Sequence, residues 1–310
     1  MAAPSRVGSM IVVIFCLAAL GAALFYQINK LSTDAGGTPA ASSVRPSSSL
    51  HDAAGSGDLT VINAAITSKV DLDAPLTGVS GRNGQTPLML AATSGKADVV
   101  GALVGGGAKV NARAADGKTP LMLAAGWADA GVVRALLDAS ARVDERDENR
   151  WTALMMAAAR GSAESVKTLL DAGADVGARN KWQQTALMIA AQSGSSEKVT
   201  MLLSAGANVN DQDQSGATAL ALLAASEDAN ADGFESLIGA RADVNAADMD
   251  GLTPLMRAAD KGDAQRVIAL LNAGGQSGLR DRQGRSAADW ATARDDEKGR
   301  EIAGLLADAK

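Results

Sequence analysis

The chain has 310 residues, of which 47% are hydrophobic and 21% are charged, a balance typical of a folded protein with a buried core. One His and one Cys leave no partners for a His-dependent triad, a zinc cluster or a disulfide framework, so we expect no catalytic site, metal or cofactor. The formal net charge of −6 argues against a nucleic-acid partner, and we expect no small-molecule substrate either.

The chain begins with an apolar run. Residues 7–29 carry no charged side chain, and residues 10–26 are apolar without interruption. This length falls where spanning helices of about 17 to 25 residues overlap with signal peptides. The run continues past the small residues Ala19-Leu20-Gly21 into Leu24-Phe25-Tyr26, and aromatic side chains suit a membrane interface. We predict an uncleaved signal anchor or transmembrane helix over residues 1–30, with a cleaved signal peptide as the alternative.

A linker follows over residues 31–48. It is rich in Gly, Ser, Thr and Pro, a composition typical of a flexible tether. The folded body is predicted over residues 49–310. By the positive-inside rule, positive charges that flank a spanning helix favour the cytoplasmic side. Arg6 and the free amine precede the apolar run, and Lys30 and Arg45 follow it. We expect the N-terminus to stay inside and the body to be exported. The predicted location is a bacterial inner membrane with the body facing the periplasm, whereas cleavage would leave the body soluble there.

The body is built on an internal repeat with a period of roughly 33 residues. Its marker is a hydroxyl residue that opens an Ala-rich run, and a Thr side-chain oxygen can cap a helix at this position. In three units Pro follows at the first helical position, where its missing N–H costs nothing. The spacing therefore predicts a helix starting after each of Thr86, Thr119, Thr152, Thr185, Thr218, Thr253 and Ser286. Gly is expected to end this helix in the left-handed conformation at Gly95, Gly161, Gly194 and Gly262.

A second helix follows in each unit. It shows Val-x-x-Leu-Leu spacing, one apolar stripe at the helical period, and stops at Gly107, Gly173, Gly206 and Gly274. Ser140 and Arg241 replace this Gly in two units, where we expect local strain. The unit around Arg241 also carries an insertion within residues 227–233.

These residues resemble the ankyrin repeat. The matching motifs are Gly84-x-Thr86-Pro87-Leu88, Ala91-Ala92, Gly95 and Gly107-Ala108-x-Val110-Asn111. The resemblance implies an all-α solenoid of about eight helix–turn–helix units with β-hairpin fingers. The first unit would be degenerate and contain Leu50-His51-Asp52-Ala53-Ala54, and the last would cap the stack with a charged helix. It also implies noncovalent protein binding rather than catalysis.

Three sets of polar or sulfur-containing residues are candidates for chemical sites. His51 occupies a structural position of the family, and no second His accompanies it. The Met series is expected to be a packed stripe, although a metal-binding or oxidation-sensing ladder is the alternative. The acidic and amide residues of the fingers are expected to hold turns, because EF-hand spacing is absent. The two series are Met89, Met122, Met155, Met188 and Met256, and Asp116, Asp147, Asn180, Asp213, Asp248 and Asp281.

Aromatic residues are rare in the body, and three of its Trp residues lie in three successive units. By the family register, Trp151 and Trp182 lie in fingers and Trp127 near the end of a first helix, positions that face the concave surface. Exposed Trp is typical of a binding hot spot. The alternative is that each packs on a neighbouring finger, and Trp290 is expected to pack in the last unit. Polar finger residues complete the candidate partner surface: Arg82, Lys118, Glu148, Lys181 and Arg282.

The leading functional hypothesis is an interaction module. A membrane-tethered solenoid would present its concave face to a protein partner of unknown identity, and we expect the chain to be a monomer. A maturation or inhibitory factor that transiently sequesters a partner enzyme is the alternative. An enzyme with unrecognised active-site carboxylates is a third possibility.

Overall fold

The computed structural model describes residues 46–78, 82–226 and 231–308. The chain divides into two compact units, Met1–Val44 and Arg45–Lys310, and all elements below belong to the second. The predicted anchor and residues 31–45 of the predicted linker lie outside the described residues. Across the three described ranges, no helix combines the length and apolar character needed to cross a membrane.

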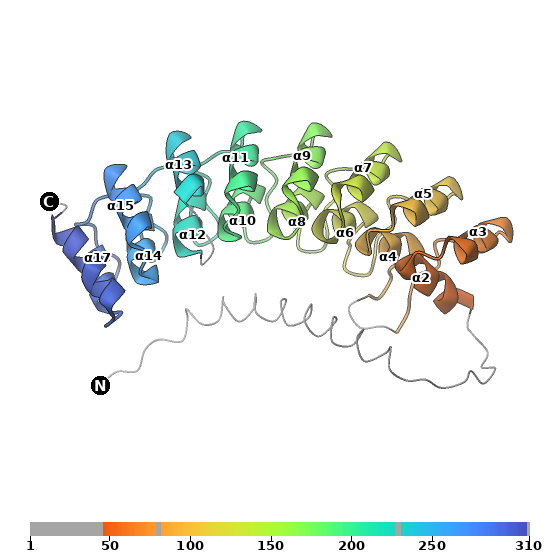
Figure 1. Ribbon diagram of the computed structural model, residues 1–310, viewed down its shortest axis with the longest axis horizontal. Helices are drawn as coiled ribbons and strands as arrows, with labels where there is room; N and C mark the ends of the chain where they lie inside the picture. The colour runs from red at the N-terminus through yellow and green to blue at the C-terminus, as the bar shows by residue number, and fades with distance from the viewer. Residues whose placement is uncertain (1–45, 79–81, 227–230, 309–310) are drawn as a thin grey trace. The chain divides into compact units, whose positions relative to one another are not determined.

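Within these ranges the helices follow one another in pairs. The first helices form one layer of the unit and the second helices the other, and each helix packs on its counterpart in the next pair (Figure 1). The first-helix layer lies on the inner, concave side of the arc. The pairs are α2 (Pro46–Ser56) and α3 (Leu59–Thr67), α4 (Pro87–Thr93) and α5 (Ala97–Gly105), α6 (Pro120–Trp127) and α7 (Ala130–Asp138), α8 (Ala153–Ala159) and α9 (Ala163–Asp171), α10 (Ala186–Gln192) and α11 (Ser196–Ser204), α12 (Ala219–Ala225) and α13 (Ala231–Gly239), α14 (Pro254–Lys261) and α15 (Ala264–Asn272), and α16 (Ala287–Thr292) and α17 (Glu297–Asp308).

The predicted Thr caps are confirmed. Each Thr has an extended backbone, and its Oγ1 accepts a hydrogen bond from the backbone N–H three residues later, at 3.4 Å for Met89 and 3.3 Å for Met256. Six pairs, from α4 to α15, begin this way, and we count these as the regular repeats. The predicted number of about eight was too high for regular repeats, because α2 lacks the Thr cap and α16 begins after Ser286 instead.

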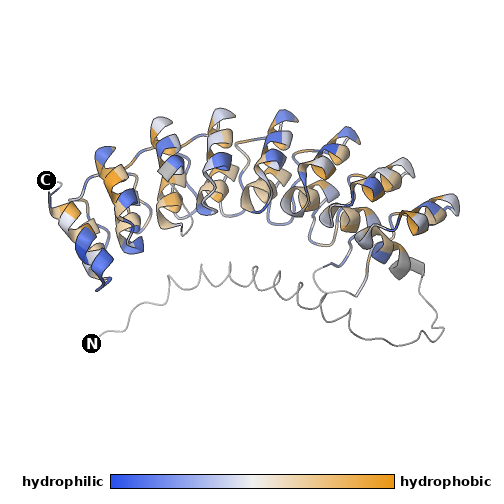
Figure 2. Ribbon diagram, viewed as in Figure 1, coloured by the Kyte–Doolittle hydropathy of each residue, from blue (hydrophilic) through white to orange (hydrophobic). Residues whose placement is uncertain are grey.

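The core lies between the two layers. The paired Ala residues of the first helices α4, α6, α8, α10 and α14 are fully buried, and in α12 Ala224 is buried while Ala225 is half-buried. Figure 2 colours both layers by hydropathy, with hydrophobic residues in each. The five Met residues of the series are at most 1% exposed, which confirms the packed stripe. Burying one such side chain stabilises the fold by roughly 1.5 to 3 kcal/mol. The same burial leaves these thioethers inaccessible to a metal or an oxidant.

Most predicted left-handed positions are confirmed. Gly95, Gly194 and Gly262 have φ between +69° and +74°, and the four Gly residues that end second helices are also left-handed. Gly161 is an exception, and the prediction for it was wrong. Its φ is not left-handed; instead a Cβ there would collide with the carbonyl oxygen of Ala125 and lie 2.8 Å from Ala157 Cα. A close approach of two repeats therefore explains this Gly.

Three residues other than Gly close second helices in the left-handed region: Ser140 and Arg241, as expected, and Lys69 after α3, with φ of 55°. Ser140 has φ of 67° and Arg241 has φ of 64°. A side chain in this conformation costs about 1 kcal/mol or more relative to Gly. The strain predicted for the loops of Ser140 and Arg241 is confirmed.

The predicted β-hairpin fingers need correction, because none of the described residues forms a strand. We use the word finger for the tight turn that comes shortly before each first helix, such as residues 147–151 before α8 and residues 180–184 before α10. The backbone bonds within a finger form a tight turn instead of a ladder; for example, Asp147 N–H donates to Trp151 O at 3.0 Å and Arg150 N–H donates to Asp147 O at 2.9 Å. Another bond joins neighbouring fingers, since Glu148 N–H donates to Asp116 O at 3.1 Å. The same bond joins each finger to the next one, from the finger that contains Asn83 to the finger that contains Arg282.

A row of side-chain amides and carboxylates also ties successive repeats together. In each case Oδ1 accepts the backbone N–H of a residue in the next repeat at 2.8 or 2.9 Å. The acceptors are Asp73, Asn111, Asp144, Asn210 and Asn245. Gly177 occupies the same register position between Asp144 and Asn210, and it has no side chain to make this bond.

Replacing Gly177 with Asn is expected to raise the free energy of unfolding by about 1 kcal/mol, because it supplies the absent inter-repeat hydrogen bond. Gly278→Asn is the matched control, since Gly278 shares the register but no equivalent loop follows it. Both glycines have room for a Cβ and neither is left-handed. Denaturant melts should show a gain for Gly177→Asn beyond that of Gly278→Asn, and equal shifts would refute the role of this row.

Candidate interaction surface on the fingers

The base of each finger is held by one side chain. Oδ1 of Asp147, Asn180, Asp213, Asp248 and Asp281 accepts two backbone N–H groups, from the second and fourth residues that follow. The predicted turn-holding role is confirmed for these five residues. Asp116 lies two positions farther along its finger, where it also holds a turn: its Oδ1 accepts the Lys118 backbone N–H at 3.2 Å, and its Oδ2 is 2.6 Å from Lys118 Nζ.

Two finger carboxylates differ in their pKa. Burial raises the pKa of Asp147 above its ordinary value, although the backbone N–H groups of Trp151 and Asn149 oppose this. Burial also opposes ionisation of Asp281, but hydrogen bonds from Arg285 and Trp290 and the charge of Arg285 outweigh it. They hold the pKa of Asp281 below its ordinary value.

The tip of most described fingers requires Gly. Gly84, Gly117, Gly216, Gly251 and Gly284 lie three residues after the base position with φ between +77° and +81°. A Cβ on Gly84 would lie 2.6 Å from Ala115 N, and one on Gly117 would lie 3.0 Å from Glu148 N. The backbone of the next finger therefore approaches the tip closely, and both conformation and space favour Gly.

Two successive fingers depart from this rule. Arg150 and Gln183 occupy the tip position with φ of 61° each. Such a conformation costs on the order of 1–3 kcal/mol for a residue other than Gly, and it persists only where the surroundings enforce it. Sequence reasoning did not single out these two residues. Aligning the tips would have revealed them, because Gly is replaced only there among the described fingers.

The three predicted Trp residues lie in different environments. Trp182 is at a finger tip and 41% exposed, whereas Trp151 directly precedes the Thr152 cap, is half-buried and packs on the core. Their fingers are neighbours, since Lys181 N–H donates to Asn149 O at 3.0 Å. Trp127 is 43% exposed but lies at the opposite end of its first helix, where the guanidinium of Arg160 stands 5.2 Å from its ring centre. The structure thus brings together two of the three.

The predicted polar residues also separate. Glu148, Lys181 and Arg282 are exposed at finger tips, while Arg82 and Lys118 are half-buried. Sequence reasoning missed Met249, which is 58% exposed at the tip of its finger and is the most exposed of the large hydrophobic residues described. Aligned repeats would have revealed Met249, because it is an apolar residue at the finger position where Glu148 and Lys181 stand in earlier fingers.

The last finger packs on the final pair of helices. Asp281 has a fully buried side chain, and its Oδ2 accepts hydrogen bonds from Arg285 Nε at 2.8 Å and Trp290 Nε1 at 3.1 Å. The guanidinium of Arg285 stacks 3.8 Å from the ring centre of Trp290. The packing role predicted for Trp290 is confirmed.

His51 has the environment of a structural residue. It is buried, and its Nε2 lies 3.2 Å from Gln85 O, which ties α2 to the segment that precedes α4. Throughout residues 46–78, 82–226 and 231–308, no three His, Cys, Asp or Glu side chains are placed to hold a metal ion.

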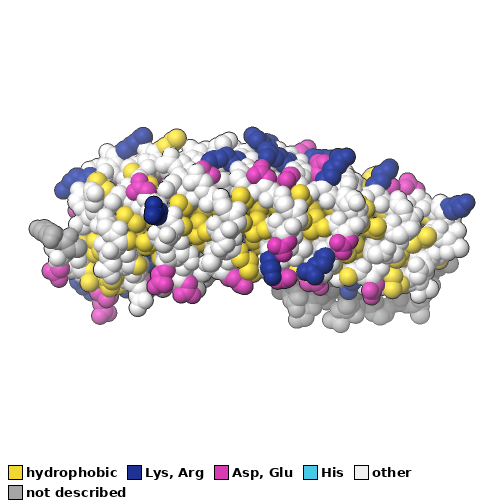
Figure 3. Space-filling view, turned by 90° about the horizontal axis from the view of Figure 1, so that it is seen from above, with side chains coloured by type: hydrophobic (Ala, Val, Ile, Leu, Met, Phe, Trp, Pro, Cys, Tyr) yellow, Lys and Arg dark blue, Asp and Glu magenta, His cyan; other side chains and the backbone are white. Residues whose placement is uncertain are grey.

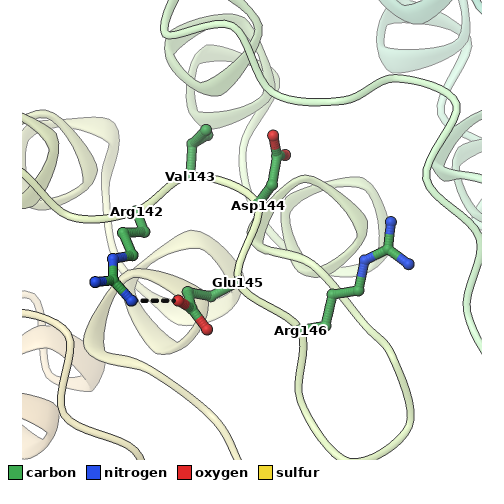
Figure 4. A pocket seen from close by; sticks show the side chains of 5 residues that line it. All are labelled: Arg142, Val143, Asp144, Glu145 and Arg146. Carbon is green, nitrogen blue, oxygen red and sulfur yellow. Dashed lines mark hydrogen bonds and ion pairs between the residues drawn. The ribbon is translucent and has the colours of Figure 1, made fainter.

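An open depression in the loop Arg142–Arg146 carries charged side chains, but they are already paired. Glu145 accepts hydrogen bonds from Arg142 at 3.1 Å and from Arg113 at 2.8 Å, and Arg146 points away from both (Figure 4). These contacts join two repeats. We therefore assign the loop a structural role.

The outer face, formed by the second helices, differs from the fingers. Hydrophobic side chains run along its middle, and charged groups gather toward its edges (Figure 3). One row of half-buried aliphatic residues packs against the core in successive second helices: Val104, Leu137, Leu170, Leu203, Ile238 and Leu271. The second helices also expose Val61 and Ile268, but these two lie far apart, on α3 and α15. Met249 is more exposed than either and Trp182 is a larger side chain, so we take the fingers as the better candidate for a partner.

Comparison with known proteins is consistent with this architecture. A family model described as ankyrin repeats in three copies matches residues 50–147, 128–213 and 221–310. No curated protein matches the sequence significantly.

Proposed function

Because the chain belongs to the ankyrin repeat family, whose members typically act as non-enzymatic protein-interaction modules, we propose that it binds one protein partner through its fingers and concave face. The observation that carries this proposal is the exposure of Trp182 and Met249 at finger tips, in a body whose other large apolar residues are mostly buried. Exposed Trp and Met are typical of binding hot spots and adaptable interfaces. Glu148, Lys181 and Arg282 would supply the polar rim.

The end pairs of the stack fit this role as caps. Helices α2 and α3 would be a degenerate first repeat, and α16 and α17 a last repeat with a polar outer side. Solenoids need such solvated ends to remain soluble. With them the proposed stack has eight units.

The exposed tips can be tested by affinity purification of the full-length chain from solubilised membranes, with mass spectrometry. The partner should be recovered with wild type and with the outer-helix variant Lys167→Ala, but lost with the double variant Trp182→Ala and Met249→Ala. Equal recovery with all three would place the partner on another surface. Recovery only of unfolded or cofactor-free proteins would favour a maturation factor.

We also propose that residues 1–30 tether the body to a bacterial inner membrane, with the body in the periplasm. The support is the uncharged run 7–29 and the linker that follows it. We expect the chain to stay in the membrane fraction through alkaline extraction and to retain residues 10–26. A mature N-terminus near Ala22 would contradict the tether and favour a soluble periplasmic body.

A further inference from the structure

The two strained finger tips coincide with the two finger Trp residues. Arg150 lies in the finger of residues 147–151 with Trp151, and Gln183 lies in the finger of residues 180–184 with Trp182. Every other described finger places Gly at this tip position. Gly would remove the strain in both, so each side chain is present at a cost in stability.

The remaining left-handed residues other than Gly do not share this setting. Lys69, Ser140 and Arg241 close second helices, and Asp295 follows α16. They are distributed along the stack rather than gathered in neighbouring turns. Strain at the tips is therefore confined to one place, and strained residues are often found at binding sites.

The charges of these two fingers are open to a partner. Arg150 and Lys181 are both exposed, and the described residues offer neither of them an ion pair. By contrast, cations at neighbouring finger positions are engaged, as in Arg113 with Glu145 at 2.8 Å and Arg179 with Asp211 at 2.7 Å. The inter-finger bond between Lys181 N–H and Asn149 O brings the two unpaired cations onto adjacent turns.

We propose that residues 147–151 and 180–184 form the recognition site for an extended acidic protein segment. Its carboxylates would pair with Arg150 and Lys181, and an apolar side chain of the same segment would pack on the exposed indole of Trp182. This inference rests on the proposed function and names the chemistry of its partner. Among the exposed side chains of the site, the two cations face the single acid Glu148, because Asp147 is buried at the finger base, and this gives the exposed surface the complementary charge.

The first test measures stability and binding together in the full-length chain. Arg150→Gly and Gln183→Gly should each raise the thermal midpoint by about 2 to 4 °C, because Gly removes the left-handed strain. Ser140→Gly and Arg241→Gly are matched controls and should raise it similarly. Only Arg150→Gly and Gln183→Gly should also weaken partner binding, by about fivefold or more. If all four variants are more stable but bind the partner as wild type does, the proposed recognition site is wrong. If Arg150→Gly and Gln183→Gly are not more stable than wild type, the claim that these two tips are strained is wrong.

The second test uses p-benzoylphenylalanine as a photo-crosslinking probe, placed at Asn149 in the site or at Lys167 on α9 as the outer-face control. We expect crosslinks from Asn149 to a protein segment of net negative charge, and their loss in Lys181→Glu. Crosslinks to a basic or uncharged segment, or only from Lys167, would overturn the acidic site while leaving a protein partner in place. Absence of crosslinks from both positions would refute the proposed function itself.

Discussion

Replacing Asp281 with Asn is expected to lower the free energy of unfolding by about 2 to 3 kcal/mol at neutral pH, because a buried carboxylate would be lost from beside Arg285. Asn can still accept the backbone bonds from Gln283 and Arg285. It cannot supply the charge that pairs with the Arg285 guanidinium, and its second side-chain atom is a donor facing Trp290 Nε1.

Asp147→Asn is the matched control for this variant. Asn180 holds the next finger with the same pair of backbone bonds, both at 2.9 Å, so an amide fits this position. Burial raises the pKa of Asp147, so its charged form is not favoured by folding. Denaturant melts at neutral pH should show a change of about 0.5 kcal/mol or less, or a gain. Equal losses of stability for Asp281→Asn and Asp147→Asn would refute the claim that the charge is needed only at Asp281.

The two carboxylates also predict opposite dependences on pH. The folded pKa of Asp281 is lowered, so its contribution is present above its unfolded pKa and is lost as pH falls through the folded value. The folded pKa of Asp147 is raised, so its contribution is present below its unfolded pKa and is lost as pH rises through the folded value. The penalty of Asp281→Asn should therefore shrink in melts repeated at acidic pH.

Replacing Trp151 with Ala is expected to lower the free energy of unfolding by about 3 kcal/mol, because the half-buried indole packs on the core. The same change at Trp182 should cost about 1 kcal/mol or less, since this side chain is largely exposed. Melts of the two variants compare the same substitution on neighbouring fingers. A larger loss for Trp182→Ala would make that residue structural and weaken its proposed role in binding.

Local sequence signals predicted the helices well. Thr caps, Pro at the first helical position and the Val-x-x-Leu-Leu stripe act within one repeat, so their structure follows from nearby residues alone. Gly161 shows where this reasoning fails. Its tightest contact is with Ala125, a residue of the preceding repeat, in addition to Ala157 of its own helix, so the requirement does not follow from its own helix end alone.

The candidate site was predictable only in part, for the same reason. Trp151 and Trp182 are alike in residue type and differ by two positions in the finger register, yet one packs on the core and the other is exposed. Exposure depends on which side chains the next repeat places over each position. The composition of the fingers does not encode this, whereas the replacement of Gly by Arg150 and Gln183 can be read from aligned repeats.

The central claim is that the fingers, and not the outer face, bind the partner. It is tested most directly by titrating the partner recovered from membranes against full-length wild type, Trp182→Ala and Lys167→Ala. We predict that Trp182→Ala weakens affinity by about thirtyfold, equivalent to ~2 kcal/mol, and that Lys167→Ala leaves affinity unchanged. Unchanged affinity for Trp182→Ala together with weaker binding by Lys167→Ala would contradict the claim and place the interface on the outer helices.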